Sequence, residues 1–254
     1  MVRFFANPKD ISGSLIRLSV EDAEHIRALR LRPFEQFLVC DGAGTDHLCR
    51  LSNKYGDGES VPLSPSILPL PVAEIIETFP SQGEPSINCI VFIAFAKGDR
   101  LDYAVQKSVE LGARGITLFP SERCVSIPGD IKKKTARLQR ISLETAKQCG
   151  RGRIPEISAA DSFVAAIDLA VCSELSLFLY ECEDKLHLKQ ALERCGIVRA
   201  VSIVTGPEGG FEPFEAEYAH SAGMIPVTLG PRILRCETAP IAALAALMFH
   251  TGNM

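Results

Sequence analysis

The sequence predicts an α/β protein in which a parallel sheet, covered by helices on both faces, follows a small antiparallel β-barrel. Residues 87–96 form a nearly continuous apolar run, which is typical of a strand buried on both faces. Strand-like and helix-like segments alternate from there to the C-terminus, as they do in parallel sheets. Residues 1–79 contain short strand-like runs separated by turns and prolines, a pattern that favours a small barrel.

Composition and length indicate two globular domains. The 254 residues are 46% hydrophobic and 23% charged, which is ordinary for a protein with a substantial core. We expect domains at 1–79 and 80–254, joined near the segment Ser81–Pro85. The first ten residues lack a signal-peptide apolar segment, and no stretch approaches the ~20 apolar residues of a membrane span. The nine cysteines make no CxxC pair and no zinc-type cluster, so we expect a cytoplasmic protein with reduced thiols, no metal and no membrane association.

The N-terminal domain contains candidate strands at 15–18 and 37–40, a turn at 41–44 and one helix at 21–31. Prolines at 62, 65, 69 and 71 predict that any later strand of this domain is an edge strand. The helix and its end carry Arg27, Arg30 and Arg32. These arginines are either RNA contacts or simply the solvated face of a helix.

The second domain offers a helix at 100–111, which Asp99 can cap and Gly112 can end. A strand is expected at 115–119, and further strands at 175–181, 200–205 and 224–229, with a helix at 186–195. The last helix contains many alanines. We expect Thr238 to be its N-cap and Pro240 to lie in its first turn, where proline is tolerated.

Two glycine-bearing loops follow strands near the C-terminus. Gly206-Pro207-Glu208-Gly209-Gly210 follows one strand, and Gly230-Pro231-Arg232 follows the next. Glycine lets a backbone approach a ligand closely, and ligands of α/β sheets bind beyond the carboxyl ends of parallel strands. The two loops are therefore expected to form two walls of one pocket, although each is also consistent with an ordinary strand-to-helix turn.

The loop TGPEGG, followed by LGPRILRCETA, resembles the signature of the RsmE family of the SPOUT superfamily. Three further segments resemble that family in the expected order: HIRALRLRPFEQFLVCDGAG, KGDR with QKSVELGARGITLFPSERC, and ETAKQCGRGRIPEI. Cys236 stands where the family is expected to have threonine.

The resemblance implies an S-adenosylmethionine-dependent enzyme that methylates N3 of a uridine in small-subunit (16S) ribosomal RNA. It also implies a SPOUT-type sheet with a C-terminal trefoil knot, a PUA-like RNA-binding barrel and a homodimer. The cofactor residues that it implies are Glu181, Gly206, Pro207, Glu208, Gly209, Gly210, Leu229, Gly230, Ile233, Leu234 and Thr238.

Uridine N3 is a poor nucleophile until it loses its proton, and an arginine beside the resulting anion would stabilise the transition state. Arg232 and Arg235 are the candidates for this role. Glu237 is either the base or the carboxylate that orients an arginine, unless it only caps its helix or forms a structural ion pair.

Charge is distributed unevenly along the chain. The whole chain carries −4, but between Arg123 and Arg153 nine Lys or Arg side chains face two carboxylates, so this segment carries +7 and the remainder −11. Such asymmetry favours a local phosphate-binding face, although a charged run is commonly just a solvated surface. The RNA-binding candidates are Arg27, Arg30, Arg32, Arg123, Arg140, Lys147, Arg151 and Arg153.

Two other functions stay open at this point. One is a different SPOUT RNA methyltransferase, acting on a ribose 2′-oxygen or on transfer RNA; the other is a non-catalytic RNA-binding protein. A Rossmann-type methyltransferase is disfavoured because its glycine loop should follow the first strand of the sheet, whereas here the glycine loops come last.

Overall fold

The computed structural model describes residues 1–32, 34–52 and 71–254. The chain divides into two compact units, which are not the two continuous domains expected. The first unit is Met1–Glu84 together with Ala146–Ile154, and the second is Pro85–Thr145 together with Pro155–Met254. The division after Glu84 lies five residues beyond the expected boundary, and a nine-residue segment from the middle of the chain belongs with the N-terminal residues.

The first unit is built on a curled six-stranded sheet with the strand order β1-β4-β5-β6-β3-β2. Its strands are antiparallel neighbours except for β1 and β4, which run parallel. The elements are β1 (Arg3–Phe5), a 3-10 turn η1 (Pro8–Asp10), β2 (Ile11–Ser12), β3 (Leu15–Arg17), α1 (Val20–Ala28), β4 (Gln36–Cys40), β5 (Thr45–Leu51) and β6 (Val72–Pro80).

The core of the first unit follows from the alternation of apolar residues along its strands. Phe4 and Phe37 are fully buried and meet edge to face, with ring centroids 5.5 Å apart. Helix α1 begins at a capping box in which the Ser19 hydroxyl accepts from the Asp22 amide and the Asp22 carboxylate accepts from the Ser19 amide. It ends three residues before the expected position, because Arg30 adopts a left-handed φ of 53° that a helix cannot continue.

The expectation of an edge strand was wrong for β6, which lies between β3 and β5 and pairs with both. Pro71 stands just before the strand, where its missing N–H interrupts no ladder. The other three prolines of that argument, at 62, 65 and 69, lie outside the described residues.

The second unit contains an all-parallel sheet with the strand order β12-β10-β11-β7-β8-β9. Its strands are β7 (Asn88–Ala94), β8 (Gly115–Phe119), β9 (Glu156–Ala159), β10 (Leu175–Leu179), β11 (Ala200–Thr205) and β12 (Ile225–Val227). Its helices are α2 (Arg100–Glu110), α3 (Ile131–Cys149, whose last turn belongs to the first unit), α4 (Phe163–Ala170), α5 (Leu188–Arg194), α6 (Pro213–Ser221) and α7 (Thr238–His250).

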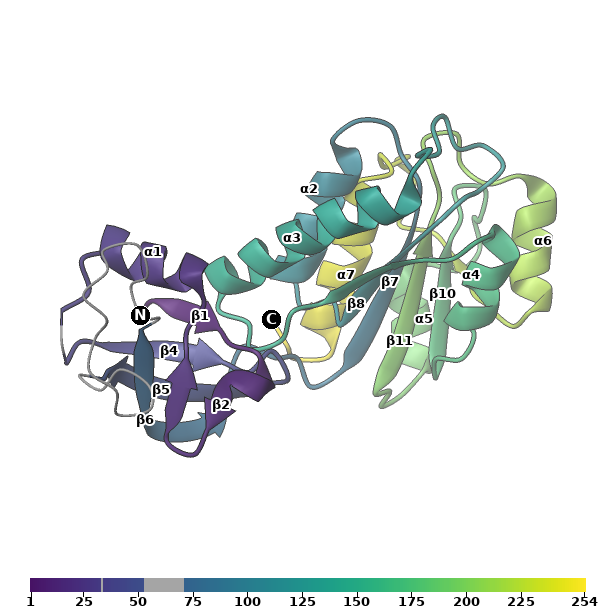
Figure 1. The fold of residues 1–254 in the computed structure, drawn as a ribbon. Coiled ribbons are helices and arrows are strands. Elements are labelled where there is room, and N and C mark those ends of the chain that lie inside the picture. The colour runs from purple at the N-terminus through teal and green to yellow at the C-terminus, as the bar shows by residue number, and fades with distance from the viewer. Residues whose placement is uncertain (33, 53–70) are drawn as a thin grey trace. The chain divides into compact units, whose positions relative to one another are not determined.

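Helices cover both faces of this sheet, as the sequence predicts (Figure 1). Helices α4 and α6 enclose a core with Phe92, Phe178 and Phe211, whereas α7 packs against β7, β11 and α2. The face of α7 that carries Ala243, Leu244 and Leu247 is fully buried. Its small residues therefore allow close packing inside its own unit.

Local details of the second unit differ from the expectations at two helix starts. Asp99 is the N-cap of α2, but its side chain makes no capping hydrogen bond. Glu237, not Thr238, is the N-cap of α7. Within the described residues, no helix is long and apolar enough to cross a membrane, and none of the nine cysteines forms a disulfide.

Candidate active site

A cavity of about 1040 Å³ lies in the second unit, beyond the carboxyl ends of β10, β11 and β12. Its walls are the segments that follow these three strands, together with Arg100 from the start of α2. Every expected cofactor residue except Thr238 lines this cavity: Glu181, Gly206, Pro207, Glu208, Gly209, Gly210, Leu229, Gly230, Ile233 and Leu234. The structure thus brings together two loops that are about twenty residues apart in the sequence.

Thr238 does not line the cavity. It is exposed and forms the first residue of α7, because the helix is entered one residue earlier than expected, at Glu237. The side chains on either side of Thr238, those of Glu237 and Ala239, do line the cavity.

The expected catalytic residues Arg232, Arg235 and Glu237 all line the cavity. Both arginines are exposed, whereas the Glu237 side chain is 16% exposed. Although Glu237 is the N-cap residue, its side chain makes no capping hydrogen bond. Its Oε2 instead lies 3.8 Å from Nε of Arg100 and accepts a hydrogen bond from the Cys236 thiol at 3.3 Å. Of the four roles open to Glu237, the geometry favours pairing with an arginine.

Arg100 is one of the cavity residues that sequence reasoning missed. Its guanidinium donates to Oε1 of Glu208 and pairs with Glu237, so it joins the loops that follow β7, β11 and β12. The backbone N–H of Lys97 donates to the same Glu208 oxygen at 2.8 Å. In the sequence, the run Lys97-Gly98-Asp99-Arg100 is only one of the segments that resemble the family, and no spacing rule links it to residues more than 100 positions away.

Glu208 is a carboxylate held in its ionised form. Burial by itself would raise its pKa, but the Lys97 amide and the Arg100 guanidinium outweigh burial and hold the pKa of Glu208 below its usual value. Its other oxygen, Oε2, is buried and has no hydrogen-bond partner among the described residues. A buried acceptor of this kind normally has a partner, so this oxygen is suited to a donor group from a ligand.

The glycines of the first loop are required by contacts within the protein. A Cβ on Gly209 would lie 2.8 Å from the Cβ of Arg123, and one on Gly210 would lie 1.8 Å from Oε1 of Glu181. A Cβ on Gly206 would lie 3.0 Å from the Phe211 ring. Gly230 is different, because it has φ of +112° and no heavy atom within 4 Å of its Cβ position. Of these four glycines, only Gly230 therefore has open space at its Cβ position, although all four line the cavity.

The predicted RNA-binding residues are placed in different settings. Arg27, Arg30 and Arg32 are exposed on the first unit, and Arg140 is exposed on α3. Arg123 borders the first glycine loop, where its Nε donates to Glu212 at 2.7 Å and its Nη1 to the Gly209 carbonyl at 3.3 Å.

The basic segment is less uniform than its sequence indicates. Arg137 and Lys134 both pair with Asp102 of α2, which neutralises part of the positive charge. Arg151 departs most clearly from the expected RNA-binding residues, because it is only 2% exposed and pairs with Glu84 at 2.7 Å. Its side chain is therefore directed into the first unit rather than toward a phosphate in solvent. Lys147 is half-buried, and Arg153 is described with the first unit below.

Sequence comparison with known proteins indicates one class of protein. The model of the RNA methyltransferase domain family matches residues 83–248, which contain the whole cavity. The chain is 30% identical to the ribosomal RNA small subunit methyltransferase E of Bacillus subtilis, over 91% of this chain and 88% of the relative. It is 29% identical to the enzyme of the same name from Mesomycoplasma hyopneumoniae, over 96% and 97%.

Solved structures agree with the sequence relatives. The ribosomal RNA small subunit methyltransferase E from Neisseria gonorrhoeae, bound to S-adenosyl methionine, superposes with a TM-score of 0.80 at 32% identity, covering 98% of this chain and 97% of that one. A methyltransferase from Legionella pneumophila in complex with the same cofactor gives 0.79 at 28% identity, again covering 98% and 97%.

The fold and the cavity thus define a protein of the RNA methyltransferase domain class. Within that class the agreement extends over nearly the whole chain, the first unit included. The chain belongs to the ribosomal RNA small subunit methyltransferase E family.

The residues of the cavity fit S-adenosylmethionine. The volume is at the upper end of the range for small-molecule sites, roughly 300–1,000 Å³, which suits a nucleoside carrying an amino-acid tail. The open space at Gly230 leaves its backbone accessible to a ligand, and the unpartnered Oε2 of Glu208 can accept from a hydroxyl or ammonium group. The cofactor has groups of both kinds.

Proposed function

We propose that this protein transfers the methyl group of S-adenosylmethionine to N3 of a specific uridine in the 16S RNA of the small ribosomal subunit. The observation that carries the proposal is the cavity at the ends of β10, β11 and β12, which lies inside the matched family domain and combines a ligand-sized space with arginine-paired carboxylates. The RNA substrate is inferred from the names of the relatives, and cofactor binding is inferred from the cavity.

In this proposal, the two glycine loops hold the cofactor together with Glu181, Leu229, Ile233 and Leu234. Glu208 accepts a hydrogen bond from the cofactor through Oε2, because its Oε1 is already occupied by Lys97 and Arg100. When bound, S-adenosylmethionine supplies a methyl carbon that is already activated toward attack. The protein then has mainly to align donor and acceptor, which can contribute roughly 7–11 kcal/mol to the lowering of the barrier.

The arginines of the cavity stabilise the negative charge that develops on the uridine base. A uridine that has lost its N3 proton carries negative charge on its carbonyl oxygens, and a guanidinium fixed beside them stabilises the transition state. Arg232 and Arg235 extend from the loop after β12, and Arg100 lies between Glu208 and Glu237. We assign Glu237 the role of orienting Arg100. The N3 proton passes to solvent, and the bonding electron pair of the broken carbon–sulfur bond stays on the sulfur, which becomes a neutral thioether.

The finer features of the fold are part of the same proposal. We propose that the C-terminal segment forms a trefoil knot of the SPOUT type. The position of β12 beside β10 supports this, because the chain leaves β11 on one side of β10 and returns on the other. We propose that the curled sheet of the first unit is a PUA-like RNA-binding module, supported by the exposed Arg27, Arg30 and Arg32.

The working form is proposed to be a cytoplasmic homodimer that acts on ribosomal RNA, within the small subunit. Two exposed apolar side chains of the second unit support the dimer: Ile233 at the cavity is 87% exposed, and Phe249 at the end of α7 is 76% exposed. Burial of such side chains against a second copy would remove apolar surface from water.

The function is tested by incubating the protein with tritiated S-adenosylmethionine and small ribosomal subunits from cells that lack it. The expected product is N3-methyluridine in a nuclease digest of the 16S RNA, and a parallel reaction with transfer RNA should give no label. A ribose-methylated nucleotide, which resists alkaline hydrolysis, would instead identify a 2′-oxygen methyltransferase. Cofactor binding without transfer to any RNA, or no cofactor binding at all, would contradict the proposal.

A further inference from the structure

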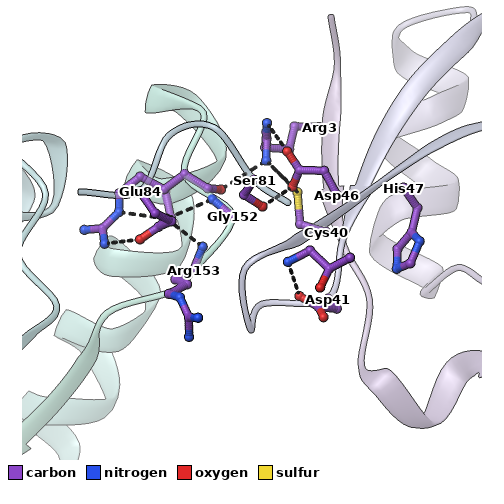
Figure 2. Close-up of polar contacts among 12 residues, drawn as sticks. Arg3, Cys40, Asp41, Asp46, His47, Ser81, Glu84, Gly152 and Arg153 are labelled. Atoms are coloured by element: carbon purple, nitrogen blue, oxygen red, sulfur yellow. Dashed lines mark hydrogen bonds and ion pairs between the residues drawn. The ribbon is translucent and has the colours of Figure 1, made fainter. Parts of the chain in front are cut away.

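Glu84 is the last residue of the N-terminal part of the first unit. Its carboxylate binds the backbone of residues 152–153, which come from the middle of the chain (Figure 2). Its Oε1 accepts from the amides of Gly152 and Arg153, both at 3.0 Å, and from Nε of Arg151 at 3.3 Å. Its Oε2 accepts from Nη2 of Arg151 at 2.7 Å. Two successive amides and a guanidinium make an anion-binding nest, and here the protein's own carboxylate fills it.

A second buried carboxylate extends this network into the sheet. Asp46 accepts two hydrogen bonds from Arg3, at 2.9 and 3.0 Å, and further ones from the Ser81 hydroxyl at 2.5 Å and the Cys40 thiol at 3.0 Å. Arg3 also donates to the Arg151 carbonyl at 3.3 Å. Strands β1, β4 and β5 are thereby tied to the segment that Glu84 holds.

The segment 150–153 is closely packed against residues 81–83. A Cβ on Gly152 would lie 1.7 Å from the Ser81 hydroxyl oxygen, and one on Gly83 would lie 2.6 Å from the Gly150 carbonyl oxygen. Arg153 forms an isolated antiparallel bridge with Ala43 in the turn between β4 and β5. The backbone of this segment is thus fixed on both sides.

This fixed backbone leaves the Arg153 side chain in a defined position. Figure 2 shows the side chain extending away from Glu84, to which only its amide is bonded. The guanidinium lies over Gly44, with Nε and Nη2 each 3.0 Å from the Cβ position of that glycine, which has φ of +111°. No described carboxylate forms an ion pair with it, whereas the charges of Arg3 and Arg151 are already balanced by Asp46 and Glu84.

We propose that Arg153, lying on the turn Gly42–Gly44, is a docking site for a phosphate of the ribosomal RNA backbone, and that Glu84 is the residue that positions it. This inference rests on the proposed function, which supplies the RNA. An arginine fork binds phosphate in a bidentate manner, and the close approach to Gly44 restricts the side chain before binding, which lowers the entropy cost of ordering it. Because Glu84 occupies the backbone nest, the phosphate is bound by the side chain and not by the amides.

The test compares Arg153→Ala with Arg17→Ala, which removes an exposed arginine of the same unit on β3. Binding of 16S RNA is measured by filter retention across salt, and methyl transfer to small subunits by tritium incorporation. Arg153→Ala should raise the KM for subunits at least about tenfold. It should also reduce the log–log salt slope by about 0.7–0.9, the value of one phosphate contact. The kcat and the affinity for S-adenosylmethionine should be unchanged, Arg17→Ala should match the wild type, and Arg153→Lys should restore part of the slope.

Glu84→Gln tests the positioning role through its coupling to Arg153. Alone it should raise the KM for subunits, but in the Arg153→Ala background it should add almost nothing, because the group it positions is gone. Should Glu84→Gln fail to fold, the Arg153 variants still decide the question. The inference is overturned if Arg153→Ala keeps the wild-type KM and salt slope, if Arg17→Ala changes the slope as much, or if the effects of Glu84→Gln and Arg153→Ala add. A wild-type protein that methylates no RNA would instead refute the proposed function.

Discussion

At the scale of single residues, the active-site chemistry depends on one arginine shared between two carboxylates. Arg100 pairs with Glu208 and Glu237, which come from different loops of the cavity. An arginine can serve both because its planar guanidinium presents five donors in fixed directions. The three side chains together carry one negative charge, so the cluster is suited to a cofactor that carries a sulfonium and an ammonium group.

Arg100→Ala is expected to slow single-turnover methyl transfer by roughly 10²-fold, because it removes the side chain that holds the loops of Glu208 and Glu237 in place around the cofactor. Arg100→Lys should recover only part of the rate, since lysine keeps the charge but cannot bridge two carboxylates with one planar fork. Lys107→Ala, on the same helix and paired with Glu110, is the control and should transfer at the wild-type rate. A wild-type rate for Arg100→Ala would remove this residue from the site.

The depressed pKa of Glu208 predicts how its contribution to stability depends on pH. A carboxylate whose folded pKa lies below its unfolded value of ~4.3 contributes fully above that value and loses its contribution as the pH falls through the folded pKa. The difference in unfolding free energy between wild type and Glu208→Gln should therefore be constant from neutral pH to about pH 5. It should shrink below about pH 4. Urea titrations across this range measure it, with Glu217→Gln on the exposed face of α6 as the control. A difference that grows on acidification would contradict the assigned charge state.

At the scale of elements, much of the fold could be predicted because apolar periodicity and the positions of glycine, proline and turn residues are local signals. The strands at 115–119 and 200–205 were predicted with their observed bounds, and the parallel sheet with helices on both faces is confirmed. Helix α4 and strand β9 were not predicted individually. Helix starts were less reliable: Asp99 and Glu237 occupy N-cap positions without making a capping hydrogen bond.

What the sequence could not reveal depends on contacts between distant residues. The cavity loops could be paired from strand ends and glycines, but Arg100 reaches Glu208 across 108 positions, and only the folded sheet brings them together. Arg151 has the same explanation: it lies just after the basic helix α3, but its partner Glu84 comes from a segment 67 positions earlier in the chain. The role of β6 depends in the same way on β3 pairing with it from far earlier in the chain.

The buried ion pair between Arg3 of β1 and Asp46 of β5 is expected to stabilise the first unit. Asp46 is 1% exposed, and Asp46→Asn would leave the charge of Arg3 uncompensated, which should cost about 3–5 kcal/mol of unfolding free energy. Arg50 and Glu74 pair at a similar distance, but their side chains are 44% and 41% exposed. Arg50→Gln should therefore cost less than about 1 kcal/mol. Urea unfolding of the two variants compares them, and equal losses would show that the Asp46 network has no special role.

At the scale of the whole molecule, the division of the chain carries the main consequence. The first unit is completed by Ala146–Ile154, so the basic helix α3 begins in one unit and ends in the other. Removal of residues 1–84 would therefore leave Arg151 without Glu84, and the first unit expressed alone would lack its internal segment. Neither unit is an independent stretch of sequence, although each has its own sheet and core.

A homodimer is expected at micromolar concentration, measured by multi-angle light scattering. Phe249→Glu, which places a charge at the exposed end of α7, should shift the equilibrium toward monomer if this side chain lies in the contact. Val20→Glu, at a 63% exposed position on α1, is the control and should leave the mass unchanged. A wild-type mass of one chain at the same concentration would contradict the dimer.

The most direct measurement of the central claim is a map of methylated bases in the 16S RNA of cells with and without this protein. Methylation of N3 blocks the Watson–Crick edge of uridine, so reverse transcriptase should stop at one uridine in RNA from cells that contain the protein. The stop should vanish on deletion and return with the wild-type gene, but not with the Arg100→Ala variant. Identical maps in the two strains, or a difference that involves no uridine, would contradict the claim.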